Sequence, residues 1–313
     1  MKCEKAPKRN FKTPVKRRTT RLPPWFKMRP QTGKNYFKVR NLVKNLDLNT
    51  VCEEAQCPNI WECWNAGTAT FMILGEVCTR SCGFCNVNFG QPRALDPAEP
   101  AHVAEAVAQL GLKHVVITSV NRDELKNGGA EHFAETIRKI RQKTDCKIEV
   151  LIPDFQGKAV ALEIVLAERP DVLAHNIETV PRLQVLVRPQ ARYVRSLEVL
   201  SRAKAFGLQT KTGLMLGLGE SIREVEVVMR DLVEIGCDIF TLGQYLQPTA
   251  KHLPIARFVA PEEFLVLKRL GEKMGLSHLE SGPLVRSSYH AASQVRRMPL
   301  MHEDPLAVLK KEG

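Results

Sequence analysis

Six of the nine cysteines in this 313-residue chain lie within one short stretch. They form two groups with the spacings C-x4-C-x5-C and C-x3-C-x2-C, namely Cys52, Cys57 and Cys63, then Cys78, Cys82 and Cys85. Thiolates bind soft metals and iron–sulfur clusters. Because cysteines are rarely so crowded without a chemical reason, we expect both groups to bind metal.

Disulfides and zinc are the alternatives to an iron–sulfur cluster. A disulfide framework is typical of short secreted chains, and we expect no export signal here, because the first thirty residues lack an apolar centre. Structural zinc sites usually pair two C-x2-C knuckles, which differ from both spacings. Three thiolates on a cubane cluster leave its fourth iron for another ligand. The spacing therefore favours clusters with an incomplete set of cysteines.

The other three cysteines are isolated in the sequence. We interpret Cys146 and Cys237 as small buried hydrophobes. Cys3 has no assigned role.

Strand and helix patterns alternate after the cysteines, with a period of roughly 30 residues. We predict strands at 70–74, 114–118, 147–152, 171–176, 209–216 and 239–242. We predict the intervening helices at 103–110, 130–143, 157–166, 197–206 and 222–235. This alternation predicts an α/β fold, a partial (β/α)6 TIM-like barrel whose site lies at the carboxyl ends of the strands.

Polar residues and glycines follow several of these strands. They include the segment Gly213 to Glu220, the segment Thr118 to Glu124, the segment His175 to Glu178, and Lys211 within a strand. Glycines let a backbone approach a flat ligand, although a glycine-rich segment is more often only a turn. The polar side chains could equally belong to ordinary solvent-exposed loops. The Lys211 side chain could bury its methylene groups while its ammonium group reaches water.

The composition excludes some classes of protein. No apolar run approaches the roughly 18 residues of a membrane-spanning helix, so we expect a cytoplasmic protein that does not bind membranes. The net charge is +12, and residues 1–42 hold fourteen Lys or Arg against the single acid Glu4. No nucleic-acid recognition motif accompanies this basic arm. We therefore expect no nucleic-acid partner, and an acidic protein partner explains the charge equally well.

The segment Cys78-Thr-Arg-Ser-Cys82-Gly-Phe-Cys85 resembles the cluster motif of the radical S-adenosylmethionine superfamily. The resemblance implies a 4Fe-4S cluster whose open iron binds the amino and carboxylate groups of S-adenosylmethionine. An electron from the cluster would then cleave this cofactor to a 5'-deoxyadenosyl radical. The segment Gly213 to Glu220 is similar to the superfamily's adenosine-contacting motif.

From about Pro24 to Ala291 the chain resembles the lipoyl synthase family. The resemblance rests on the segment Thr50 to Trp64, which looks like that family's auxiliary-cluster motif, and on further segments in family order. These are residues 69–75, 118–123, 128–130, 175–180, 213–220, 244–248 and 286–289. It implies an auxiliary segment and basic arm at 1–67, a radical S-adenosylmethionine barrel at 68–276, and a C-terminal extension at 277–313.

The resemblance also assigns the site residues. A second 4Fe-4S cluster would be held by Cys52, Cys57, Cys63 and the hydroxyl of Ser288. Cofactor contacts would come from Thr118, Asn121, Asp123, Asn176, Glu178, Lys211, Gly217 and Glu220. The chain departs from the family pattern at Asn121, Asn127 and Thr212, and Asn121 lacks the charge of the common aspartate.

The implied reaction inserts two sulfur atoms, at C6 and C8, into an octanoyl chain on a lysine of a lipoyl carrier domain. Such C–H bonds resist acid–base chemistry, so a carbon radical is required, and the auxiliary cluster would be consumed as the sulfur source. The implied partners are glycine cleavage H protein, E2 subunits of 2-oxoacid dehydrogenases, a ferredoxin or flavodoxin reductant, and an iron–sulfur carrier. The rival interpretations are another sulfur-inserting radical enzyme and a zinc-dependent nucleic-acid-binding module.

Overall fold

The computed structural model describes residues 22–27, 33–66, 68–289 and 291–296. Of the basic residues 1–42, residues 1–21, which include Cys3, and residues 28–32 lie outside these ranges, whereas 22–27 and 33–42 are described. Within them, η1 (Pro24–Phe26) is a single 3-10 turn, and its Phe26 ring lies 5.6 Å from that of Phe258. No helix in the described part of the chain has the length and apolar character needed to cross a membrane.

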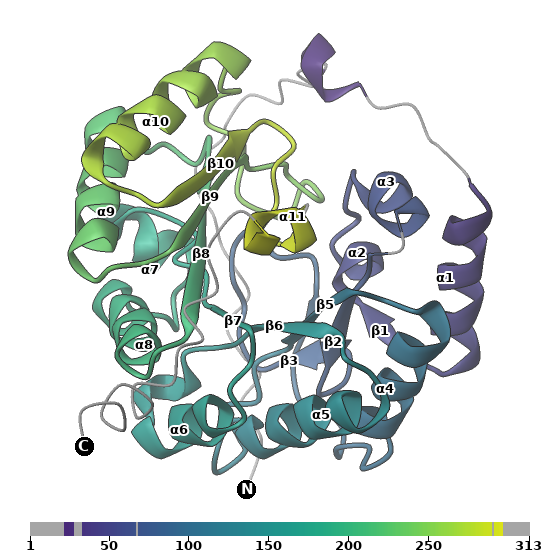
Figure 1. Cartoon of the computed structure of the whole chain (residues 1–313). Helices are drawn as coiled ribbons and strands as arrows, with labels where there is room; N and C mark the ends of the chain where they lie inside the picture. The colour runs from purple at the N-terminus through teal and green to yellow at the C-terminus, as the bar shows by residue number, and fades with distance from the viewer. Residues whose placement is uncertain (1–21, 28–32, 67, 290, 297–313) are drawn as a thin grey trace, which may run out of the picture.

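An eight-stranded sheet forms the centre of the molecule (Figure 1). In sheet order its strands are β1 (Asn49–Thr50), β2 (Thr70–Ile73), β5 (His114–Ser119), β6 (Lys147–Leu151), β7 (Val172–Ala174), β8 (Gln209–Leu216), β9 (Ile239–Gln244) and β10 (His278–Gly282). Only the short β1 is antiparallel to its neighbour. The carboxyl ends of β2 and β5–β10 therefore meet at one end of the barrel.

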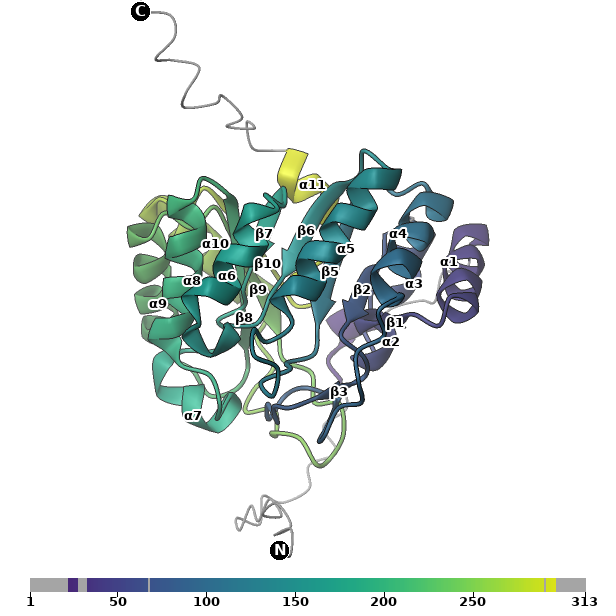
Figure 2. The same cartoon turned by 90° about the horizontal axis from the view of Figure 1, so that it is seen from below.

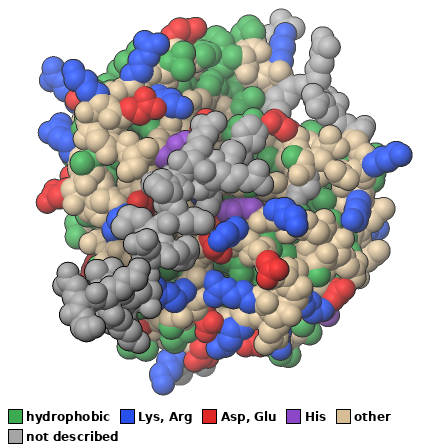
Figure 3. All heavy atoms as spheres, viewed as in Figure 1, with side chains coloured by type: hydrophobic (Ala, Val, Ile, Leu, Met, Phe, Trp, Pro, Cys, Tyr) green, Lys and Arg blue, Asp and Glu red, His purple; other side chains and the backbone are tan. Residues whose placement is uncertain are grey.

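Helices cover the outer face of the curved sheet (Figure 1). The longer ones are α1 (Lys34–Asn45), α4 (Glu99–Leu110), α5 (Ala130–Lys143), α6 (Ala159–Ala167), α8 (Tyr193–Ala205), α9 (Ile222–Glu234) and α10 (Pro261–Met274). Their apolar faces pack on the strands, and residue types set their ends: α9 begins with a Ser221–Glu224 capping box. Figure 3 shows Lys, Arg, Asp and Glu side chains interspersed over the outer helices.

Shorter elements lie mainly near the strand ends. They are α2 (Val51–Glu54), α3 (Ile60–Asn65), β3 (Val77–Cys78), β4 (Asn88–Phe89), η2 (Phe155–Gly157), η3 (Pro181–Leu183), α7 (Gln184–Val187) and α11 (Ala291–Arg296). In Figure 2, α11 lies at one end of the barrel and β3 at the opposite end. Because β3 carries Cys78, the group of Cys78, Cys82 and Cys85, called the first cysteine group from here on, lies at the carboxyl ends of the strands.

The expected barrel is confirmed, with all six predicted strands and all five predicted helices present. We did not expect the antiparallel β1, the helices α1 and α10, or β10, which is a seventh parallel strand. Of the β10 residues only Leu279 is buried, so this strand lacks a strong apolar signal. Since β10 extends the same sheet as β9, its residues His278–Gly282 belong to the barrel sheet.

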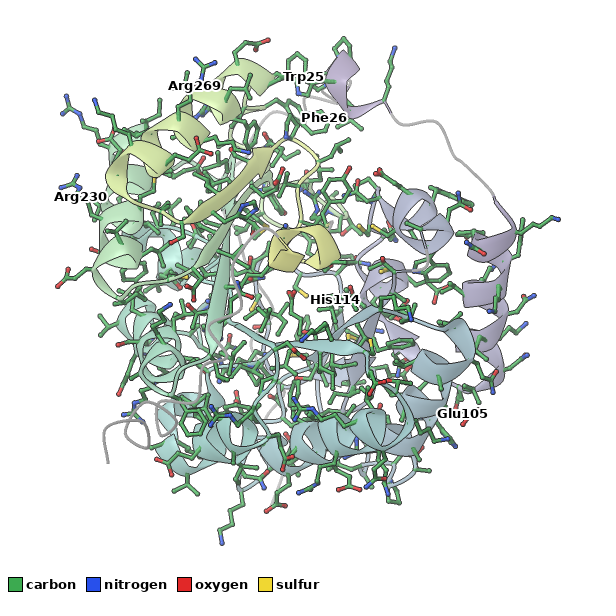
Figure 4. The ribbon with its side chains drawn as sticks, viewed as in Figure 1. Trp25, Phe26, Glu105, His114, Arg230 and Arg269 are labelled. Atoms are coloured by element: carbon green, nitrogen blue, oxygen red, sulfur yellow. The ribbon has the colours of Figure 1, made fainter. Side chains whose placement is uncertain are left out.

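Three buried charged or polar side chains lie inside the barrel, where the strands begin. The Lys211 ammonium is 2.8 Å from Glu149, whose second carboxylate oxygen is 3.3 Å from His114 Nε2. Figure 4 shows His114 within the ring of strands. Burial favours a neutral Glu149, but Lys211 and His114 hold its pKa below the usual value. The three side chains thus form a closed ionic network in the core.

Removal of this buried cation should cost far more stability than removal of an exposed one. We expect Lys211→Met to lower the free energy of unfolding by about 3–5 kcal/mol, because Glu149 is left charged in the core. The matched control is Arg202→Met, which removes a cation paired with Glu198 where both side chains are more than 40% exposed, and which should cost below about 1 kcal/mol. Anaerobic denaturant titrations of both variants test this, and equal losses would contradict it.

Candidate active site

Both cysteine groups face one cavity of about 450 Å³ at the carboxyl ends of the strands. Its wall includes all three cysteines of the first cysteine group, two of the second cysteine group (Cys52, Cys57 and Cys63), namely Cys52 and Cys57, and also Ser288. A much smaller adjoining pocket is lined by Cys52, Cys57, Cys63 and Ser288. The fold therefore brings together all seven residues that the sequence proposed as metal ligands.

The loop from Cys78 to Cys85 runs between β3 and β4 and presents its sulfurs to the cavity. The backbone N–H groups of Asn121 and Arg80 point at Cys78 Sγ, with N···S distances of 3.3 and 3.4 Å. Burial raises the pKa of Cys85 to about 12 and also raises that of Cys82. Thiols in such a site lose their protons only to a strong positive charge, which bound iron supplies.

Arg80 anchors this loop, and sequence reasoning missed it. Its guanidinium donates to both carboxylate oxygens of Asp123, at 2.7 and 2.9 Å, and to Asp154 at 2.6 Å. Asp154 in turn pairs with Arg195 at 3.1 Å. A bidentate arginine–carboxylate pair fixes orientation as well as distance. Its position between Cys78 and Cys82 could have indicated a role in this loop. The sequence alone does not show that its partners are the distant residues Asp123 and Asp154.

Four predicted cofactor-binding residues lie on the cavity wall: Thr118, Asn121, Asn176 and Glu178. The side-chain oxygens of Asn121 and Asn176 are buried and accept no hydrogen bond from the described residues. Buried acceptors without donors are costly. A ligand with an ammonium group and hydroxyls would satisfy them, so this wall fits S-adenosylmethionine.

Two arginines on the same wall were not predicted as cofactor contacts. Arg188 donates to the carbonyl oxygens of Asn176 and Ile177, at 2.8 and 3.1 Å, and its charge faces Cys82 and Glu178. Arg286 lines both pockets, and its charge faces Cys57. Burial raises the pKa of Glu178 although both arginines oppose this. The cavity therefore carries fixed positive charge beside both cysteine groups, as anionic clusters and a carboxylate require.

The other four predicted cofactor contacts do not line the cavity. Asp123 is occupied by Arg80, and Lys211 by Glu149. Glu220 accepts the N–H groups of Gly217 and Leu218, at 2.6 and 2.9 Å, and so closes the turn after β8. Gly217 has a φ of +94°, and a Cβ there would lie 2.6 Å from the carbonyl oxygen of Arg257. These side chains shape the loops and core behind the wall.

The second cysteine group lies in α2, α3 and the loop between them. Thr50 caps α2, whose buried Cys52 has a pKa raised to about 11, first by burial and then by Cys57. Burial likewise raises the pKa of Cys63 to about 12. Among the described residues, no three His, Cys, Asp or Glu side chains are grouped closely enough to hold a single metal ion. A cubane cluster needs wider spacing, because each thiolate binds a different iron.

Comparisons with known proteins agree with this geometry. A model described as the radical SAM superfamily matches residues 72–232, and one described as the N-terminal domain of lipoyl synthase of that family matches residues 2–57. The crystal structure of Streptococcus suis SuiB bound to S-adenosylmethionine is similar with a TM-score of 0.53 and 14% identity, over 71% of this chain and 54% of that one. The hydrogenase maturase HydG is similar with a TM-score of 0.52 and 14% identity, over 90% and 74%. At this identity both structures show the fold alone.

Curated relatives are far more similar. The lipoyl synthase of Rubrobacter xylanophilus is 59% identical over 275 residues, which cover 87% of this chain and 86% of the relative. The lipoyl synthase of Koribacter versatilis is 54% identical over 284 residues, which cover 89% and 93%. Identity at this level extends well beyond the radical SAM core. The chain therefore belongs to the lipoyl synthase family of the radical SAM superfamily.

Proposed function

We propose that this chain is a sulfurtransferase that inserts two sulfur atoms, at C6 and C8, into an octanoyl chain carried on a lysine of a lipoyl carrier domain. The observation that carries the proposal is that both cysteine groups line one cavity. A radical formed at one group would then need to travel only within that cavity. The relatives named lipoyl synthase support this choice of activity.

We assign Cys78, Cys82 and Cys85 to a 4Fe-4S cluster with one open iron, and Cys52, Cys57, Cys63 and Ser288 to a second. S-adenosylmethionine would lie against Thr118, Asn121, Asn176 and Glu178. When bound, the first cluster and this cofactor supply a carbon radical that removes hydrogen from the octanoyl chain, and the second cluster supplies sulfur. Serine is a hard and weak ligand to iron, which suits a ligand that must leave.

The residues of the cavity bind and orient the acyl chain. Met72, Leu151 and Met215 are apolar residues of the wall and lie between the polar groups. An octanoyl chain buries its methylene groups against such a wall at a gain of about 0.8 kcal/mol each. The same wall excludes water, which protects a reactive radical from side reactions. Positioning and shielding are thus the chain's own contribution to the reaction.

The substrates would be octanoylated glycine cleavage H protein and E2 subunits of 2-oxoacid dehydrogenases. A ferredoxin or flavodoxin would supply electrons, and an iron–sulfur carrier would rebuild the consumed cluster. We propose a cytoplasmic location together with these partners. The excess of Lys and Arg over Asp and Glu, 46 against 34, would speed encounter with an acidic carrier domain.

A turnover assay tests the activity directly. Anaerobically reconstituted protein with S-adenosylmethionine, reductant and an octanoylated carrier peptide should yield a peptide that has gained two sulfur atoms, as measured by mass spectrometry. A matched peptide with a free lysine should remain unchanged. Formation of 5'-deoxyadenosine without sulfur gain would retain the superfamily and reject this substrate.

Replacement of one cysteine of the second group should distinguish the roles of the two clusters. We expect Cys52→Ala to lose about half of the bound iron and all sulfur insertion, while it still cleaves S-adenosylmethionine, because the first cluster keeps its three thiolates. Cys146→Ala is the matched control, since Cys146 is also buried but lies away from both pockets. Sulfur insertion by Cys52→Ala at the control's rate would contradict the assignment.

A further inference from the structure

Two hydrogen bonds join the second cysteine group to the segment that carries Ser288. The Asn59 amide donates to the carbonyl oxygen of Leu284 at 2.7 Å, across 225 residues of sequence. The Tyr289 hydroxyl lies 3.2 Å from both carboxylate oxygens of Glu62, across 227 residues. Glu62 precedes Cys63 and Tyr289 follows Ser288, so this second bond directly joins the neighbours of two proposed ligands.

The Asn59 side chain forms a hydrogen bond outside its own helix. It occupies the N-cap position of α3, where an asparagine side chain normally accepts a backbone N–H of its own helix. Its side chain makes no such bond here, although it is only 1% exposed. Its Oδ1 accepts no hydrogen bond from the described residues, and its Nδ2 donates to Leu284, which lies just beyond β10. The Asn59 side chain thus joins two distant segments and does not cap its own helix.

The segment after β10 needs such contacts because the sheet does not close. β1 and β10 are the two ends of the strand order. The backbone bonds between β9 and this part of the chain end with that from Gln244 N–H to the Pro283 carbonyl oxygen, so no ladder fixes residues 284–289. Turns at Val285 and Tyr289, through the bonds Val285 N–H to Gly282 and Tyr289 N–H to Arg286, shape this segment locally. Its placement against α2 and α3 depends on side chains.

Ser288 is held by its backbone and not by its hydroxyl. Its carbonyl oxygen accepts the N–H of Ala291 at 3.4 Å, and it lines both pockets. Its hydroxyl forms no hydrogen bond with any residue that the structure describes. A side chain placed in this way can bind iron and leave it while the backbone stays in position.

We propose that Asn59 and the Glu62–Tyr289 pair are positioning residues that hold Leu284 to Tyr289 against the second cysteine group and so keep the Ser288 hydroxyl within reach of its iron. This inference rests on the proposed function, which assigns that cluster. The two bonds act as a latch: Ser288 would leave the iron when sulfur is withdrawn, and the backbone held by these bonds would keep the same hydroxyl in place for the rebuilt cluster. Neither Asn59 nor Tyr289 takes part in the chemistry itself.

The test uses iron release from the anaerobic holoenzyme to a chelator, with S-adenosylmethionine present to occupy the first cluster. Tyr289→Phe removes one hydroxyl and should release the second cluster's iron about fivefold faster, the factor associated with one ordinary hydrogen bond. Tyr193→Phe is the matched control, because the Tyr193 hydroxyl also bonds a carboxylate, that of Asp231 at 2.6 Å, outside both pockets. It should release iron at the wild-type rate. Glu62→Gln keeps an acceptor oxygen and should stay near the wild-type rate.

A double-mutant comparison separates positioning from a merely structural effect. If the latch acts through Ser288, Tyr289→Phe should accelerate release in the wild-type background but add nothing in a Ser288→Ala background. Equal acceleration in both backgrounds, or none in either, would overturn the latch. A wild-type protein with about four irons instead of eight would overturn the proposed function, and with it the second cluster. Iron release from Asn59→Ala, measured in the same two backgrounds, independently tests the bond from Asn59 to Leu284.

Discussion

The architecture depends on a parallel sheet that remains open. Parallel strands send all their carboxyl ends to one side, so loops distant in sequence meet around one cavity. Since β1 and β10 do not pair, the two ends of the sheet leave a seam. The second cysteine group precedes β2, and Ser288 follows β10, so this seam is where the first and last parts of the barrel can build a site together.

Buried charge fixes the parts that the backbone does not. Arg80, with a side chain 3% exposed, ties the first cysteine loop to Asp123 and Asp154. Lys211 and Glu149 lie deeper, behind the cavity, and neutralise each other. The attraction within each pair offsets the free-energy cost of removing its charges from water only when the charged groups are close and well oriented. Each pair therefore tolerates little displacement. The first cysteine loop is thus held by ion pairs that lie behind the cavity wall.

Most of the fold, and the chemistry of the site, could be predicted from local patterns. The spacing of the cysteines and the period of the apolar segments are properties of short stretches, and the predicted bounds of α5 agree with the structure. β10 could not be predicted in this way, because its pairing with β9 and not its own residues makes it a strand. This explains why the barrel has one more parallel strand than expected.

The roles of polar residues were harder to predict than their positions. The family resemblance predicts Asp123 and Lys211 as cofactor contacts, and in the structure these side chains pair with Arg80 and Glu149. Glu220 faces the backbone of its own turn. Conversely, Arg188 lies on the cavity wall, although it belongs to none of the sequence motifs. Such pairings depend on three-dimensional proximity, which a single sequence does not contain.

The central claim is that the second cysteine group supplies the sulfur for a reaction begun at the first. The most direct measurement is a single turnover with protein whose clusters were rebuilt from heavy-isotope sulfide, in buffer that contains only light sulfide. Both sulfur atoms of the product peptide should carry the heavy isotope. A product that contains light sulfur from the buffer would contradict this claim.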